Sequence, residues 1–108
     1  MADRVFITGI AGFLGSHIAD AFIEDGYEVA GNDNLKGGYV SNVPEEAEFH
    51  EIDCNDLKEL KEAMEGADIV YHTAALAYEG LSVFSPAQIN RSIYQATTST
   101  LAAAADNE

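Results

Sequence analysis

The 108-residue chain has few basic residues: 5 lysines and arginines stand against 19 aspartates and glutamates, giving a formal net charge of -14 at pH 7. Such an acidic surface repels phosphate backbones and anionic lipid headgroups. We therefore expect neither nucleic acid nor a membrane as a partner. Two explanations of the acidity stay open, an ordinary solvated surface and an adaptation to high salt.

Cysteine is equally scarce, and long apolar runs are missing. The single cysteine, Cys54, excludes an internal disulfide and suits a reducing compartment. No basic and apolar leader precedes the first apolar run, and no run approaches the roughly 20 residues that span a bilayer. These absences predict a cytoplasmic protein.

The apolar residues that are present alternate between short runs and helical stripes. The runs predict strands over residues 5–8, 28–33, 49–52 and 69–71. Helices are expected over residues 13–26, 56–66 and about 87–105. The apolar stripes of the first two are Leu14, Ile18, Ala21 and Phe22, and Leu57, Leu60, Met64 and Ala67.

Strands that alternate with helices imply right-handed crossovers and a parallel α/β sheet with helices on both faces. Four strands would lie in the order 3-2-1-4. A fifth strand would be due after residue 108, so we expect this sheet to be incomplete. At the second helix, Asp56 and Glu59 have the spacing of a capping box.

Three glycines, Gly9, Gly12 and Gly15, follow the first strand and open the first helix. Gly9 allows a tight turn, Gly12 lets the backbone approach a pyrophosphate, and Gly15 lets the helix lie close to the sheet. The helix N-terminus would direct free N–H groups at the phosphates. A flavodoxin-like turn without a dinucleotide is the alternative.

An acidic residue, Asp33, closes the second predicted strand 24 residues after Gly9. At this position a carboxylate can accept both ribose hydroxyls of an adenosine. It would repel a 2′-phosphate, so the sequence favours NAD over NADP. Lys36 is the one contrary indication.

Four segments, in order and at matching spacing, resemble the extended short-chain dehydrogenase/reductase family, which contains NAD-dependent nucleotide-sugar epimerases and dehydratases. They are Thr8-Gly9-x-x-Gly12-Phe13-Leu14-Gly15, Asp33-Asn34-Leu35, Asp53-Cys54 and His72-Thr73-Ala74-Ala75. The resemblance implies a Rossmann-type fold whose cofactor-binding residues are Gly9, Gly12, Phe13, Leu14, Gly15, Asp33, Asn34, Asp53, Cys54, Thr73, Ala74 and Ala75.

The family's catalytic Tyr-x-x-x-Lys is not found, and the stretch at residues 92–97 departs from the family's Asn-Val-x-Gly-Thr. In an intact relative that tyrosine acts as acid and base, the lysine lowers its pKa, and a hydride passes to the nicotinamide. We therefore expect residues 1–108 to be the N-terminal portion of an NAD-binding domain, without the catalytic strand and the substrate domain.

This portion would belong to an epimerase or dehydratase of a nucleotide sugar and be inactive alone, with no catalytic residue assigned. The alternative is a truncated module that binds a dinucleotide without turnover. A homodimer stays open. The histidines, His17, His50 and His72, match no metal-ligand spacing, so no metal is expected, and His72 is interpreted as a packed strand-end residue. The loop at residues 78–82 is where the family's substrate pocket begins.

Overall fold

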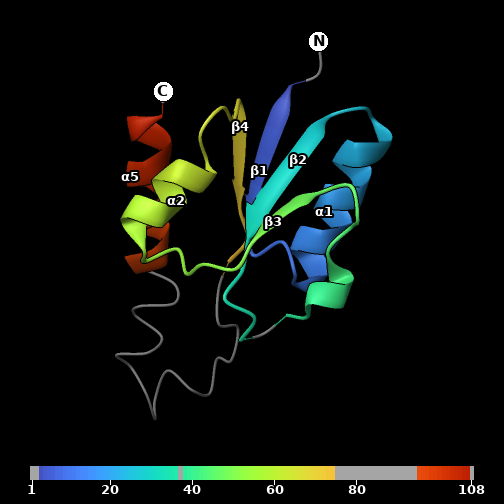
Figure 1. Cartoon of the computed structure of the whole chain (residues 1–108), viewed down its shortest axis with the longest axis horizontal. Helices are drawn as coiled ribbons and strands as arrows, with labels where there is room; N and C mark the ends of the chain where they lie inside the picture. Colours follow the sequence, from blue (N-terminus) through green and yellow to red (C-terminus); the bar gives the residue numbers. More distant parts are fainter. Residues whose placement is uncertain (1–2, 37, 75–94, 108) are drawn as a thin grey trace.

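The computed structural model describes residues 3–36, 38–74 and 95–107. Its centre is a parallel sheet with the strands in the order β3-β2-β1-β4 (Figure 1). The strands are β1 Arg4–Thr8, β2 Glu28–Asn32, β3 Glu48–His50 and β4 Ile69–His72. The predicted α/β class and strand order are confirmed.

Helices cover both faces of this sheet, as predicted. In Figure 1, α1 lies on one side of the strands, and α2 and α5 lie together on the other. Within the described residues the helical segments are α1 Phe13–Glu24, the 3-10 turn η1 Val40–Asn42, α2 Leu57–Ala63 and α5 Ala96–Asp106. None of these helices is long and apolar enough to cross a membrane.

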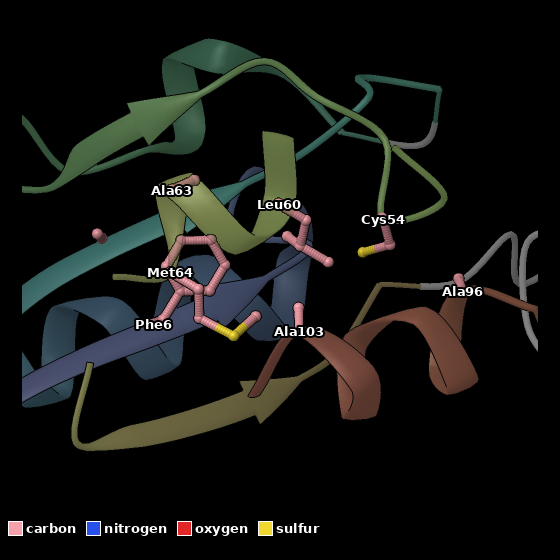
Figure 2. Packing of buried hydrophobic residues seen from close by; sticks show 8 residues of the cluster. Phe6, Cys54, Leu60, Ala63, Met64, Ala96 and Ala103 are labelled. Atoms are coloured by element: carbon pink, nitrogen blue, oxygen red, sulfur yellow. The ribbon is translucent and has the colours of Figure 1, made fainter. Parts of the chain in front are cut away.

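The core is divided in two by the alternation of side chains along β1. Val5 and Ile7 point to the face that α1 covers and pack with Ala19 and Val29. The fully buried Phe6 points to the opposite face. There it joins a cluster supplied mainly by α2 and α5, which Figure 2 shows from close by and which contains Ala30, Cys54, Leu60, Ala63, Met64, Ala96 and Ala103.

The predicted apolar stripe of α1 was partly wrong. Leu14 is 59% exposed and Ala21 is also exposed, whereas Gly15, Ser16 and Ala19 are buried. The cause is close packing at the start of the helix, because a Cβ on Gly15 would lie 2.2 Å from the carbonyl oxygen of Gly9. The helix therefore turns its small residues toward the sheet.

The predicted ends of the second and third strands were slightly wrong. The second strand ends at Asn32, and the carboxylate of the residue after it accepts the Ala11 N–H of the turn that follows β1. The third strand was placed at residues 49–52 but spans Glu48–His50. Beyond it the chain turns, with the Ile52 N–H donating to the carbonyl of His50 over 3.0 Å.

The predicted capping box of α2 was also wrong. Asp56 is the N-cap residue, but its side chain makes no capping hydrogen bond. Its N–H instead donates to the carbonyl of Asp53 over 3.0 Å, which continues the preceding turn. Leu57 is 39% exposed, so the buried stripe of α2 begins at Leu60. The predicted start of the last helix at residue 87 lies outside the described residues.

Candidate functional site

The four strands end in register at one edge of the sheet. Thr8 on β1 is paired with Asn32 on β2 and with His72 on β4, and Asn32 is paired with His50 on β3. Parallel strands direct all their carboxyl ends to the same edge, where ligands of open α/β sheets bind. The predicted cofactor residues follow these strand ends.

The turn after β1 requires glycine at Gly9. Its φ is +74°, and its N–H donates to the carbonyl of Asn32 over 2.8 Å. A Cβ at this position would lie 2.8 Å from the backbone nitrogen of Ala74. The turn is therefore tied to β2 and packed directly against the segment that follows β4.

The other two glycines of the motif differ in what surrounds them. Gly15 is held against the Gly9 carbonyl, so packing within the chain excludes a side chain there. Gly12 has an ordinary φ of -84°, and among the described residues a Cβ on it would meet only the Gly9 oxygen, at 3.3 Å. The described part of the chain therefore leaves the outer side of Gly12 largely open.

Gly12 is also the N-cap of α1, and a glycine has no side chain with which to cap the helix. The first N–H groups of a helix have no intrahelical partner, and the helix dipole adds positive potential at this end. The first turn carries no acidic residue to offset that potential. Phe13 and Leu14 are exposed at 81% and 59% beside it.

Asp33 lies next to the glycine-rich turn and is 9% exposed. Its Oδ2 accepts a hydrogen bond from the Ala11 N–H over 3.0 Å, and its Oδ1 accepts one from the Leu35 N–H over 2.7 Å. These two bonds fix the plane of the carboxylate. Each oxygen keeps acceptor capacity beyond its one backbone partner.

The segment after Asp33 reaches the loop that follows β3. The Asn34 amide nitrogen donates to Oδ2 of Asp53 over 3.1 Å, and the other oxygen of that carboxylate accepts the Asn55 N–H over 2.9 Å. Leu35, the residue after Asn34, has a φ of +64°. Positive φ is rare for a bulky residue and is found mostly in functional segments.

Cys54 is 4% exposed and packs in the core cluster shown in Figure 2. Burial raises the pKa of its thiol, although the hydrogen bond from the Asn32 amide over 3.5 Å acts in the opposite direction. The thiol therefore stays protonated at neutral pH. Cys54 is therefore a small buried group of the core rather than a reactive thiol.

The segment after β4 is fixed by Thr8. Its hydroxyl oxygen accepts the N–H groups of Thr73 over 3.0 Å and of Ala74 over 3.2 Å. His72 is half-buried and lies within 2.7 Å of the same oxygen, so its interpretation as a packed strand-end residue is confirmed. Ala75 and the loop at residues 78–82 lie outside the described residues.

The structure thus brings together Gly9, Gly12, Gly15, Asp33, Asn34, Asp53, Thr73 and Ala74 at one sheet edge, with Cys54 buried behind them. Among the described residues no group of three or more potential ligands could hold a metal ion. The sequence did not predict the positive φ of Leu35, the bonds of Thr8 to the segment after β4, or the bond of the Asn32 carbonyl to the Gly9 N–H. Of these residues only Thr8 could have been noticed in the sequence, because it directly precedes the first glycine of the motif.

Comparison with known proteins agrees with this arrangement. The sequence model of the NAD dependent epimerase/dehydratase family matches residues 5–108. A UDP-glucose 4-epimerase of Streptomyces lividans is 35% identical over 89 residues, which are 80% of this chain and 27% of that protein. The chain thus spans about a quarter of the length of the curated relatives it matches.

Two solved structures have the same fold over nearly the whole chain. The UDP-glucose 4-epimerase of Brucella ovis, solved in complex with NAD, has a TM-score of 0.88 and 40% identity, over 94% of this chain and 32% of that one. The UDP-glucose 4-epimerase of Thermotoga maritima, solved with UDP-glucose, has a TM-score of 0.92 and 32% identity, over 96% and 34%. The chain belongs to the NAD dependent epimerase/dehydratase family, as its motifs indicated.

Proposed function

We propose that this chain is the NAD-binding part of an NAD-dependent epimerase or dehydratase that acts on a nucleotide sugar. The observation that carries the proposal is the hydrogen bond between the Asp33 carboxylate and the Ala11 N–H. It joins an acidic acceptor to the turn below an uncapped helix N-terminus. The family match and the NAD complex of the Brucella ovis relative support it.

The residues present fit a dinucleotide. A pyrophosphate on the open side of Gly12 would meet the first N–H groups of α1, which no described side chain caps. The buried and oriented carboxylate of Asp33 has lone pairs left for two ribose hydroxyls. Asn34 and Asp53, bonded to each other, would then lie on the adenine side.

At the nicotinamide side, Thr73, Ala74 and Ala75 would be the small residues that leave room for the cofactor. When bound, NAD would supply a hydride acceptor, and the protein would supply binding and orientation. The described residues would bind and orient the cofactor, and we propose none of them as a catalytic acid or base.

The second candidate is a module that binds NAD without turnover. It is favoured by the sequence around the lysines, since the residues four positions before Lys36, Lys58 and Lys61 are Asn32, Cys54 and Leu57. The tyrosine of the family's catalytic pair has no counterpart before any of them. We therefore assign epimerase or dehydratase activity to the whole protein and none to these residues alone. A cytoplasmic location remains part of the proposal.

Calorimetric titration of the purified chain with NAD tests the binding function. We expect saturable binding that Asp33→Ala weakens about tenfold, because charged hydrogen bonds to two hydroxyls are lost. Asp20→Ala removes an exposed carboxylate on α1 and is the matched control, with unchanged affinity expected. Absence of NAD binding by a folded chain, or equal losses in both variants, would contradict the proposal.

A separate assay distinguishes the two candidates. The purified chain is incubated with NAD and UDP- or dTDP-linked sugars, while absorbance at 340 nm and the sugar products are followed. Losing the acid/base alone lowers a rate by about 10²–10⁴-fold. We expect no turnover, and turnover at rates typical of enzymes would refute our assignment of the catalytic groups to other residues.

A further inference from the structure

The imidazole of His72 joins the sheet to a helix. At the end of β4, its Nδ1 lies 2.7 Å from the hydroxyl oxygen of Thr8 on β1. Its Nε2 lies 2.9 Å from the hydroxyl oxygen of Thr97 on α5. One half-buried ring therefore bridges two elements that are distant in the sequence.

The hydrogen bonds of Thr8 determine which nitrogen of this ring carries the proton. A hydroxyl has one hydrogen to donate and two lone pairs to accept with. Both lone pairs of Thr8 Oγ1 are engaged, one by the Ala74 N–H and the other by the Thr73 N–H, which is shared with the Thr8 carbonyl over 3.1 Å. Its hydrogen is therefore donated to Nδ1 of His72. Nδ1 is then the acceptor, and the ring proton is on Nε2, where it is donated to Thr97.

This chain of hydrogen bonds ends at the proposed cofactor site. The Thr73 hydroxyl also donates to the Thr8 carbonyl. Thr8 therefore holds the segment through both its hydroxyl oxygen and its carbonyl oxygen. The Ala74 nitrogen lies 2.8 Å from where a Cβ of Gly9 would stand. Ala74 thus occupies the space that a side chain at Gly9 would need, and a displacement away from β1 would break its bond to Thr8.

We propose that His72, as the neutral Nε2–H tautomer, is a positioning residue that holds the Thr73–Ala74 segment and α5 in the arrangement that NAD requires. The inference rests on the proposed NAD-binding function. It goes beyond that function by assigning a role to a side chain that is not itself proposed to touch the cofactor. Thr8 transmits the effect of the imidazole to the two backbone N–H groups.

Protonation of His72 would disrupt this arrangement. An imidazolium must donate from both nitrogens, and Thr8 Oγ1 has no lone pair left to accept from Nδ1. Among the described residues, the groups bonded to the ring are the hydroxyls of Thr8 and Thr97, and neither titrates near neutral pH. Burial lowers the pKa of His72 below its ordinary value of 6.5, and no charged group of the described residues contributes to that shift. The neutral form therefore prevails above about pH 6.5, and the bond to Thr8 is lost as the pH falls through the lowered pKa.

The first test does not involve NAD. Nitrogen-15 NMR of the histidine rings at pH 7.5 reports the tautomer, and hydrogen exchange reports the protection of the Thr73 and Ala74 amides. We expect the Nε2–H tautomer, and an amide protection that falls as His72 is protonated. An Nδ1–H tautomer, or protection that does not depend on the state of His72, would overturn the inference even if NAD binds.

The second test measures NAD affinity from pH 7.5 to 5.5. We expect His72→Phe to weaken binding about five-fold at pH 7.5, the usual effect of one lost hydrogen bond. His72→Asn should restore most of the affinity, because its side-chain oxygen can accept from Thr8. It should also remove the loss at low pH, since an amide does not protonate.

His50→Gln is the matched control, because His50 is bonded to Glu48 on β3 rather than to Thr8. This variant should keep the pH profile of the wild-type chain. Equal pH profiles for wild type and His72→Asn would overturn the inference. If the folded wild-type chain binds no NAD at any pH, the proposed function fails, and the tautomer and amide protection decide the inference alone.

Discussion

The Oδ2 atom of Asp33 accepts the backbone N–H of Ala11 over 3.0 Å, although the two residues are 22 positions apart. This bond joins the end of β2 to the glycine-rich turn after β1. A second bond, from the Leu35 N–H to Oδ1, fixes the orientation of the carboxylate. The groups proposed to hold ribose and pyrophosphate are therefore positioned by each other before any ligand arrives.

This orientation predicts the choice of cofactor. The 2′-phosphate of NADP would face the Asp33 carboxylate, so NAD should bind at least about tenfold more tightly. Asp33→Ala should narrow this preference, whereas Lys36→Ala, which removes an exposed positive charge nearby, should not narrow it. Competition calorimetry with both cofactors measures the ratio, and equal affinities in the wild-type chain would contradict the assignment of Asp33.

Two glycines of the motif should affect different properties: Gly15 the stability of the fold, and Gly12 mainly the affinity for NAD. Gly15→Ala would place a Cβ 2.2 Å from the Gly9 oxygen and should destabilise the fold by about 1–3 kcal/mol. The Cβ of Gly12→Ala would meet only one atom of the described residues, at 3.3 Å, so its cost should be about 1 kcal/mol or less. It should nevertheless weaken NAD binding. Thermal melts measure the stability of the two variants, and calorimetry measures their NAD affinity. An equal loss of stability in both variants would contradict the different roles of Gly12 and Gly15.

The hydrogen bonds of Glu48 predict that the fold becomes less stable at acidic pH. Hydrogen bonds from His50 and from Arg4, at 3.0 and 2.8 Å, lower the pKa of its carboxyl below the ordinary 4.5. A lowered folded-state pKa gives stability that is complete above about pH 4.5 and is lost as the pH falls through the folded value. Because Glu48 is 57% exposed, the effect should be at most about 1 kcal/mol.

The check is a comparison of melting temperature from pH 6 to 3 in wild type and Glu48→Gln. The variant should lose part of the acid dependence, and Glu46→Gln, at an exposed neighbouring position, should keep all of it. Identical profiles for all three chains would show that the ion pair contributes nothing to folding.

The net charge of -14 predicts a dependence on salt. Like charges spread over a small surface repel each other and destabilise the compact state. Added KCl should raise the melting temperature, mostly while the Debye length falls to about 10 Å near 0.1 M. A melting temperature that does not change with salt would show that the carboxylates do not repel each other appreciably.

The sequence predicted the fold and the glycine and aspartate positions because their chemistry is local. A turn that needs Gly9, and a carboxylate directly after a strand, are visible in a few adjacent residues. The rotation of α1 was missed because it depends on contact between Gly15 and Gly9, which periodicity does not register. The positive φ of Leu35 was missed because leucine seldom adopts it.

The link between His72 and Thr8 was missed for a different reason. The two residues are 64 positions apart and meet only because β1 and β4 pair in register. The same holds for Asn32, whose amide donates to the carbonyl of Ile52 over 2.9 Å, 20 positions away. Such contacts follow from the sheet order, so they can be deduced only after the strands are aligned.

Titration of the nitrogen-15-labelled chain with NAD tests the central claim most directly. If the cofactor lies across the carboxyl ends of the strands, the largest amide shifts should be at Gly12, at residues 33–35 and at residues 73–74, with little change at the opposite ends of the strands near Arg4 and Asp68. Saturating shifts confined to those opposite ends, or none at millimolar NAD in a folded chain, would contradict it.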